Sequence, residues 1–130
     1  MNDSIIPEGF KDDVSSQVST EHKFKNIIID CFQNNGYTLV KTPLIEYFDR
    51  EKNQNVFKIE TSKNQKKLSI RDDITLQIAR LSETRLSKKN KPLKLCYYGE
   101  VLRIKGSMLR PERQFLQIGA ECIGEKNLLA

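Results

Sequence analysis

Two strand-like segments in the last third of the sequence constrain the fold more than any other feature. They cover residues 93 to about 104 and about 113 to 123, and the segment between them contains Gly106 and Pro111. Glycine and proline are common turn residues, because glycine allows unusual backbone angles and proline presets one of them. We therefore expect a long antiparallel hairpin, which any fold assigned to this chain has to accommodate.

A long helix is expected well before these strands. Ser15 or Ser16 can cap its first turn, and Gly36 stands where a left-handed residue would end it after about residue 35. Its apolar residues recur at spacings of three and four, so most of them share one stripe of the helix surface: Val18, Phe24, Ile27, Ile28, Cys31 and Phe32.

Short strands are expected between this helix and the long hairpin. Residues 37–40 read as a strand that stops before Pro43. Residues 56–59 and 68–71 flank the polar loop 61–67, a pattern that predicts a second hairpin.

A second helix should follow that hairpin. Asp72 or Asp73 can cap it, and Ile74, Ile78 and Leu81 recur along one side at helical spacing. The residues from 125 onward look like the beginning of a further helix. Helices combined with antiparallel hairpins, without a regular alternation of strand and helix, indicate an α+β fold.

Length and charge exclude several classes of protein. A chain of 130 residues forms one domain, for which residues 1–13 are an expected flexible lead with Pro7 and Gly9 as breakers. The longest wholly apolar run covers only residues 27–29, whereas a membrane span needs ~20 residues. The N-terminus lacks the pattern of a secretory signal, so we expect a cytoplasmic protein. The net charge of +5 permits a nucleic-acid or phosphate partner without requiring one.

The three cysteines give no sign of a metal or redox site. Cys31, Cys96 and Cys122 are odd in number and widely spaced, and the sequence contains no CxxC pair. Each lies in an apolar stretch, so we expect three small core residues. Neither a metal nor a cofactor is expected.

The last strand carries the most informative polar residues. Side chains alternate across a strand, so Gln117, Gly119 and Glu121 share one face with Arg113 and Phe115. The other face is expected to be the core face: Gln114, Leu116, Ile118, Ala120 and Cys122. The glycine should leave an empty slot between an amide and a carboxylate, which together suit an ammonium or an imidazole N–H donor. A solvent-facing strand with a bulge glycine is the alternative.

Two arginines are expected near the mouth of the long hairpin. Arg103 and Arg113 would approach each other there, and two guanidinium groups suit a carboxylate or a phosphate. The alternative is a pair of exposed cations beside Glu100 and Glu112. The single histidine, His22, is expected at the surface of the first helix, so a histidine-based catalytic triad is excluded.

Four segments resemble class II aminoacyl-tRNA synthetases. Residues 36–44, GYTLVKTPL, resemble the first class II motif, whose proline lies at a dimer interface. Residues 97–103, YYGEVLR, and 113–121, RQFLQIGAE, resemble the second motif in the form typical of the histidyl branch. Residues 70–75, IRDDIT, resemble the substrate loop of that branch. The resemblance covers about residues 6–124 and implies a partial class II core with an antiparallel sheet flanked by helices.

The departures from the synthetase pattern favour its non-catalytic paralogue, the regulatory subunit of ATP phosphoribosyltransferase. The synthetase loop reads RPEGT, whereas RDDIT here is similar to the RPDIT of the regulatory subunit. Lys105 stands where the synthetase has a glutamate that holds the adenine, and a cation cannot accept from the adenine amino group. Pro111 replaces the phosphate-binding arginine, although Arg110 is adjacent. The third motif and the anticodon-binding domain have no counterpart in these residues.

The resemblance implies a histidine site and a dimer interface. Three residues would hold the α-ammonium of histidine: Asp73, Thr75 and Gln117. Glu121 would accept from the imidazole, and Arg103 would face the carboxylate. Arg110 and Arg113 are candidates for binding an anion or a phosphate. The interface would contain Pro43, Leu44, Ile45 and Phe48, whose alternative place is the core of a monomer.

The implied function is that of a regulatory subunit without catalysis, needed for activity and histidine feedback in the first step of histidine biosynthesis. Its partners would be the catalytic subunit of ATP phosphoribosyltransferase and histidine as effector, with a homodimer inside a hetero-oligomer. One alternative is a truncated or split histidyl-tRNA synthetase. Another is an RNA-binding module built on the basic loop: Lys88, Lys89, Lys91 and Lys94. The 113–123 strand is also expected to have an open edge or to pair with another chain.

Overall fold

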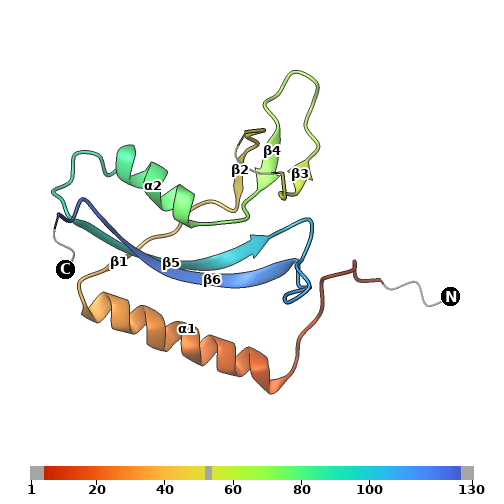
Figure 1. Ribbon diagram of the computed structural model, residues 1–130, viewed down its shortest axis with the longest axis horizontal. Helices are drawn as coiled ribbons and strands as arrows, with labels where there is room; N and C mark the ends of the chain where they lie inside the picture. The colour runs from red at the N-terminus through yellow and green to blue at the C-terminus, as the bar shows by residue number, and fades with distance from the viewer. Residues whose placement is uncertain (1–4, 52–53, 127–130) are drawn as a thin grey trace.

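The computed structural model describes residues 5–51 and 54–126, which form two helices and six strands (Figure 1). The elements follow one another along the chain as α1 Ser16–Asn34, β1 Thr38–Leu39, β2 Ile45–Tyr47, β3 Lys58–Ile59, β4 Leu68–Ile70, α2 Thr75–Glu83, β5 Leu93–Leu102 and β6 Gln114–Ile123. The expected α+β class, both hairpins and both helices are confirmed. No helix within the described ranges is both long and apolar enough to cross a bilayer.

Two three-stranded sheets organise these elements. The larger has the order β1-β5-β6, with β1 parallel to β5 and β6 at the edge. The β5–β6 hairpin is paired from Leu93 opposite Ile123 to Leu102 opposite Gln114, so it is the longest strand pairing among the described residues. The smaller sheet has the order β2-β4-β3 and is antiparallel. In Figure 1, α1 lies along one face of the larger sheet and α2 along the other.

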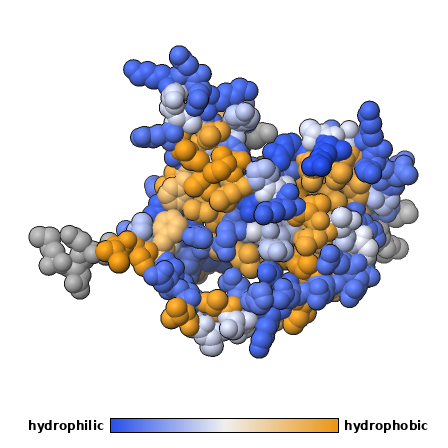
Figure 2. All heavy atoms as spheres, turned by 180° about the vertical axis from the view of Figure 1, so that it is seen from behind, coloured by the Kyte–Doolittle hydropathy of each residue, from blue (hydrophilic) through white to orange (hydrophobic). Residues whose placement is uncertain are grey.

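Local signals set the ends of α1 as expected, but its apolar stripe is largely uncovered. Ser15 Oγ accepts from the Gln17 N–H at 3.3 Å, and Gly36 has the left-handed φ of +85°. Ile29 is the buried residue of the helix, whereas Phe24 and Ile27 are 58% and 63% exposed. Apolar atoms are visible along the bottom edge of Figure 2, where this helix runs. Periodicity identifies a stripe but does not say what covers it.

The core lies between α2 and the larger sheet, on the opposite face of β6 from the one expected. Ile74 and Ile78 of α2 pack with Leu93, Leu95, Tyr97 and Val101 of β5, and Phe115 and Ile123 of β6 join them. These β6 residues share their face with Gln117 and Glu121. The expected core face is only partly covered, and Cys122 on it is exposed. The assignment was wrong because alternation separates the two faces of a strand without showing which one a helix covers.

Two other predictions, three cysteines in the core and a helix after residue 125, are not confirmed as made. Cys96 is buried, but Cys31 is exposed, so only one of the three cysteines is a core residue. The described part of the expected C-terminal helix, residues 125–126, is not helical, and the rest lies outside the described residues, as do residues 1–4. In the N-terminal segment, Phe10 N–H donates to Pro7 O at 3.1 Å, and Gly9 O accepts from the Arg113 N–H at 2.9 Å.

Candidate functional site

The loop before α2 is fixed on β6 by the side chain of Gln117. Its Nε2 donates to Asp73 Oδ1 at 2.7 Å, and its Oε1 accepts from the Ile74 N–H at 2.9 Å. Asp73 Oδ1 also accepts from the Thr75 N–H at 3.2 Å, so this carboxylate, one residue before the N-cap position Ile74, orders the first turn of α2. The loop and the strand therefore bring Asp73, Thr75 and Gln117 together, although Gln117 lies more than forty residues after the other two in the sequence.

A second chain of hydrogen bonds connects Thr75 to Glu121. Thr75 Oγ1 lies 3.0 Å from the Tyr97 hydroxyl, which donates to Glu121 Oε1 at 3.4 Å. Since Tyr97 has one hydroxyl proton and gives it to Glu121, the Thr75 hydroxyl must donate to Tyr97. Four of the five residues expected to bind histidine thus lie in one network with Tyr97.

The space above Gly119 is filled rather than empty. Tyr97 and Gly119 are directly opposite in the β5–β6 ladder, and a Cβ on Gly119 would overlap the Tyr97 hydroxyl. The expected ligand slot at this glycine was wrong, because the ring from the neighbouring strand occupies it. The glycine leaves room for the close approach of the Tyr97 ring.

Tyr97 is the site residue that sequence reasoning missed. Side chains alternate along a strand, so the sequence alone puts Tyr97 on the same face as Gly99 and Arg103, but its position opposite Gly119 depends on the register of the hairpin. Tyr97 is only 4% exposed, and burial raises the pKa of its hydroxyl above the usual value. The hydrogen bond with Thr75 lowers this pKa, and the nearby charges of Glu121 and Asp73 raise it again. The hydroxyl therefore stays protonated and acts as a donor.

Removal of this hydroxyl should change how the protein responds to alkaline pH. A raised folded-state pKa means that stability is complete below the unfolded tyrosine pKa and declines as pH rises through the folded value. We expect Tyr97→Phe to weaken this alkaline decline. Thermal unfolding from neutral to strongly alkaline pH would show it, with the exposed Tyr47→Phe as the matched control. Equal alkaline decline in both variants would contradict the assignment.

The network leaves hydrogen-bond acceptors open to a ligand. Asp73 and Glu121 each have a second carboxylate oxygen, and Thr75 Oγ1 keeps its lone pairs because its proton is used by Tyr97. Gln117 Oε1 has a second lone pair beyond the one taken by Ile74. Two carboxylates with neutral acceptors between them suit a ligand that carries several N–H donors and a positive charge.

Arg103 lies on the same face of the sheet but in a neighbouring hollow. Its guanidinium stacks 4.9 Å from the centre of the Phe115 ring. With Lys105 and Arg110 it lines a cavity of about 280 Å³. Burial raises the pKa of the Asp72 carboxyl, and the positive charge of Arg103 partly offsets this shift. The hollow therefore gathers three cations and the carboxylate of Glu112, and Arg103 places it near Asp72 in the loop before α2.

Arg113 is held away from this hollow. Its backbone is next to Arg103 as expected, since the Arg103 N–H donates to Arg113 O at 2.8 Å. Its guanidinium, however, lies 5.1 Å from the Phe10 ring centre and 4.9 Å from that of Phe57. Nη1 donates to Glu8 O at 2.8 Å, so this side chain anchors the N-terminal segment.

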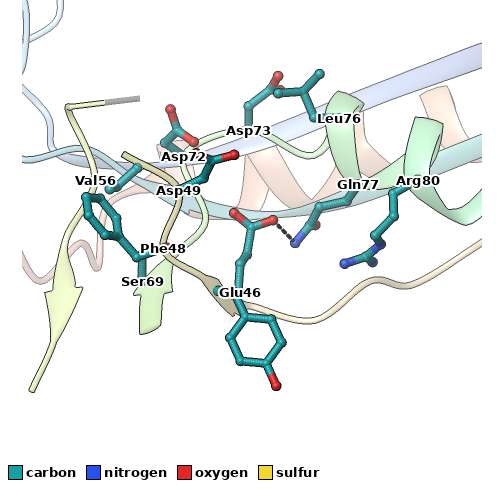
Figure 3. Close-up of a pocket in the computed structure, with 11 residues that line it drawn as sticks. Glu46, Phe48, Asp49, Val56, Ser69, Asp72, Asp73, Leu76, Gln77 and Arg80 are labelled. Carbon is teal, nitrogen blue, oxygen red and sulfur yellow. Dashed lines mark hydrogen bonds between the residues drawn. The ribbon is translucent and has the colours of Figure 1, made fainter. Parts of the chain in front are cut away.

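A larger cavity of about 390 Å³ opens on the other side of the loop, between the smaller sheet and α2 (Figure 3). Asp73 lines it together with Asp72, Glu46, Asp49 and Arg80, but Thr75, Gln117 and Glu121 do not. Sequence reasoning missed this cavity, because it depends on how the second hairpin stands against α2. No cluster of three or more metal-binding side chains occurs in residues 5–51 and 54–126.

Three of the four residues expected at a dimer interface are exposed. Leu44 and Ile45 are 43% and 42% exposed, Pro43 is exposed and Phe48 is half-buried. The described chain therefore does not use Leu44 and Ile45 as core residues.

Comparison with known proteins identifies the family. The family model described as histidyl-tRNA synthetase matches residues 9–130. The chain belongs to this family. A curated relative from Rhodospirillum rubrum, named ATP phosphoribosyltransferase regulatory subunit, is 40% identical over an alignment of 128 positions that covers 93% of this chain and 33% of the relative. A relative of the same name from Clostridium kluyveri is 34% identical over an alignment of 137 positions that covers 96% of this chain and 34% of that protein. The chain thus spans about one third of the length of these relatives.

Solved structures show the same fold. A Bacillus halodurans protein described as an ATP phosphoribosyltransferase regulatory subunit/histidyl-tRNA synthetase superposes with a TM-score of 0.80 at 26% identity, over 98% of this chain and 34% of that one. Apo histidyl-tRNA synthetase of S. aureus gives 0.69 at 26% identity, over 94% and 30%. The partial class II core expected from the motifs is confirmed, as is the resemblance to the regulatory subunits.

Proposed function

We propose that this chain is part of a regulatory subunit of ATP phosphoribosyltransferase and recognises free histidine without catalysing a reaction. The observation that carries the proposal is the network that joins Asp73, Thr75, Tyr97, Gln117 and Glu121 in one acceptor-rich site. The regulatory-subunit name of the relatives supports the choice within the family.

Histidine carries the N–H donors and the charges that suit the free hydrogen-bond acceptors of this site. Its α-ammonium would donate to Asp73, Thr75 and the free lone pair of Gln117. Its imidazole N–H would donate to Glu121, and its carboxylate would face the cations around Arg103. For histidine to regulate an enzyme from this site, it must bind the active and inhibited assemblies with different affinity.

The remaining parts of the proposal concern partners. The chain would bind the catalytic subunit, support its activity and transmit histidine feedback. A homodimer through Pro43, Leu44 and Ile45 is supported by the exposure of these apolar side chains. An anion or phosphate was expected at Arg110 and Arg113. Arg103 and Arg110 support such a site better than that pair does, since both line the same hollow and Arg113 does not.

The alternative within the family is histidine activation with ATP. Lys105 argues against it, because it lines the hollow beside Arg103 and its backbone is fixed there by paired hydrogen bonds with Asn55 at 2.9 and 3.2 Å. A lysine held in this position offers no acceptor to an adenine amino group.

Calorimetry separates the two functions. Histidine titrated into the chain should release or absorb heat, and histidinol, which lacks the carboxylate, should bind more weakly. Pyrophosphate exchange with histidine and ATP should be absent. The absence of binding both alone and with the catalytic subunit would refute histidine recognition, and histidine-dependent exchange would favour the synthetase alternative.

A further inference from the structure

Two buried side chains flank the Asp73–Thr75 loop, one on each side and each two residues away from it. Arg71 precedes Asp73 by two residues and Gln77 follows Thr75 by two residues. They are 7% and 2% exposed. Both side chains reach the same residue, Thr42, which is itself 7% exposed and lies about thirty residues earlier. Thr42 is therefore bonded to residues on both sides of this loop, to Arg71 before it and to Gln77 in the first turn of α2.

The Arg71 end is held by three backbone and hydroxyl oxygens. Nη1 donates to Thr42 O at 3.0 Å and to Thr42 Oγ1 at 3.3 Å. Nε donates to Glu100 O at 2.9 Å, which ties the same guanidinium to β5. The guanidinium lies directly over Gly99, where a Cβ would overlap Nη2. The position of Arg71 is thus limited from both the loop side and the sheet side.

At the Gln77 end, the side-chain amide makes three hydrogen bonds, and both of its N–H groups have acceptors. Its Oε1 accepts from Thr42 Oγ1 at 2.6 Å. Its Nε2 donates to Pro43 O at 2.8 Å and to Glu46 Oε1 at 2.7 Å, the latter drawn as a dashed line in Figure 3. The Thr42 hydroxyl therefore donates its proton to Gln77 while its oxygen accepts from Arg71.

We propose that Thr42 is a positioning residue for ligand binding, whose hydroxyl holds the two ends of the Asp73–Thr75 loop in one arrangement. The inference rests on the proposed histidine recognition. Buried polar groups are costly to leave without partners, so the loop ends have few alternative positions. A loop that is already ordered loses less conformational freedom on binding, and this raises affinity. Thr42 itself touches no ligand in this scheme.

A matched pair of substitutions tests the role of the hydroxyl. Thr42→Val keeps the branched shape without the hydroxyl, and Thr42→Ser keeps the hydroxyl. We expect Thr42→Val to weaken histidine binding about tenfold, as the loss of one or two buried hydrogen bonds would, and Thr42→Ser to stay within about twofold of the unchanged chain. Ile29→Val on α1 controls for lower stability, since it weakens packing away from the loop and should leave histidine affinity unchanged.

Amide hydrogen exchange gives a readout that does not need the ligand. In Thr42→Val, the amides of residues 74–78 should exchange about tenfold faster, while those of α1 keep their rates. Unchanged exchange there, or unchanged histidine affinity, would overturn the inference. Faster exchange in a chain that binds no histidine would refute the proposed function and leave the positioning of the loop by Thr42 in place.

A second variant covers the case in which Thr42→Val does not fold. Arg71→Lys keeps the charge but loses the planar fork that contacts Thr42 and Glu100 at once. It should show the same local increase in exchange and the same loss of affinity. An Arg71→Lys chain with the loop exchange and affinity of the unchanged chain would overturn the inference as well.

Discussion

Asp73→Asn should abolish most of the histidine affinity of this chain. The substitution keeps the size of the side chain and an oxygen that can accept from Gln117 and Thr75, as Asp73 Oδ1 does at 2.7 and 3.2 Å. It replaces the second carboxylate oxygen by an NH₂ group, which would meet the α-ammonium donor to donor. Hydrogen bonds to charged groups contribute about 1.5–3 kcal/mol, so we expect a loss of about 10- to 100-fold.

The neighbouring aspartate offers a matched control. Asp72→Asn makes the same chemical change one residue earlier, at a carboxylate that lines the larger cavity rather than the network. Calorimetric titration of histidine into both variants, with thermal unfolding to verify folding, should separate them. Equal affinity of Asp73→Asn and the unchanged chain would refute the assigned role of Asp73. Equal losses in both variants would point to general electrostatic attraction instead.

Local sequence signals predicted the elements of the fold well. Ser15 and Gly36 set the two ends of α1, and the turn around Gly106 joins the two strands of the long hairpin. These features depend on residues that are close in sequence, so a single chain reveals them. The chemistry of Gln117 and Glu121 was also readable, because alternation alone places both on one face of a strand.

Features that depend on distant packing could not be predicted in this way. Alternation along β6 does not show that α2 covers the face of Gln117, and so the core was placed on the wrong side. The hydrogen bonds of Thr42 with Gln77 and Arg71 link residues 35 and 29 positions apart, and no local pattern indicates them. The role of Tyr97 follows only from the register of the hairpin.

Gly119→Ala tests this register and should be strongly destabilising. A Cβ at this position would overlap the Tyr97 hydroxyl and approach the ring carbon that bears it. Because Tyr97 is packed in the core against Ile74 and Ile78, its ring has little room to move. Overpacking of a buried site costs about 1–3 kcal/mol, and we expect a loss of that size in the free energy of unfolding. The displaced hydroxyl would also release Thr75 and Glu121, so histidine affinity should fall in the chains that remain folded.

Gly36→Ala is the comparison that isolates the steric part of this effect. Gly36 has a φ of +85° and no atoms within 4 Å of an added Cβ, so alanine there incurs only the left-handed backbone penalty of about 1–2 kcal/mol. It lies at the end of α1, away from the ligand network, so histidine affinity should be retained. Denaturant unfolding and calorimetry on both variants decide the matter. If Gly119→Ala binds histidine as well as Gly36→Ala does, Tyr97 does not connect Thr75 to Glu121 in the ligand-binding state.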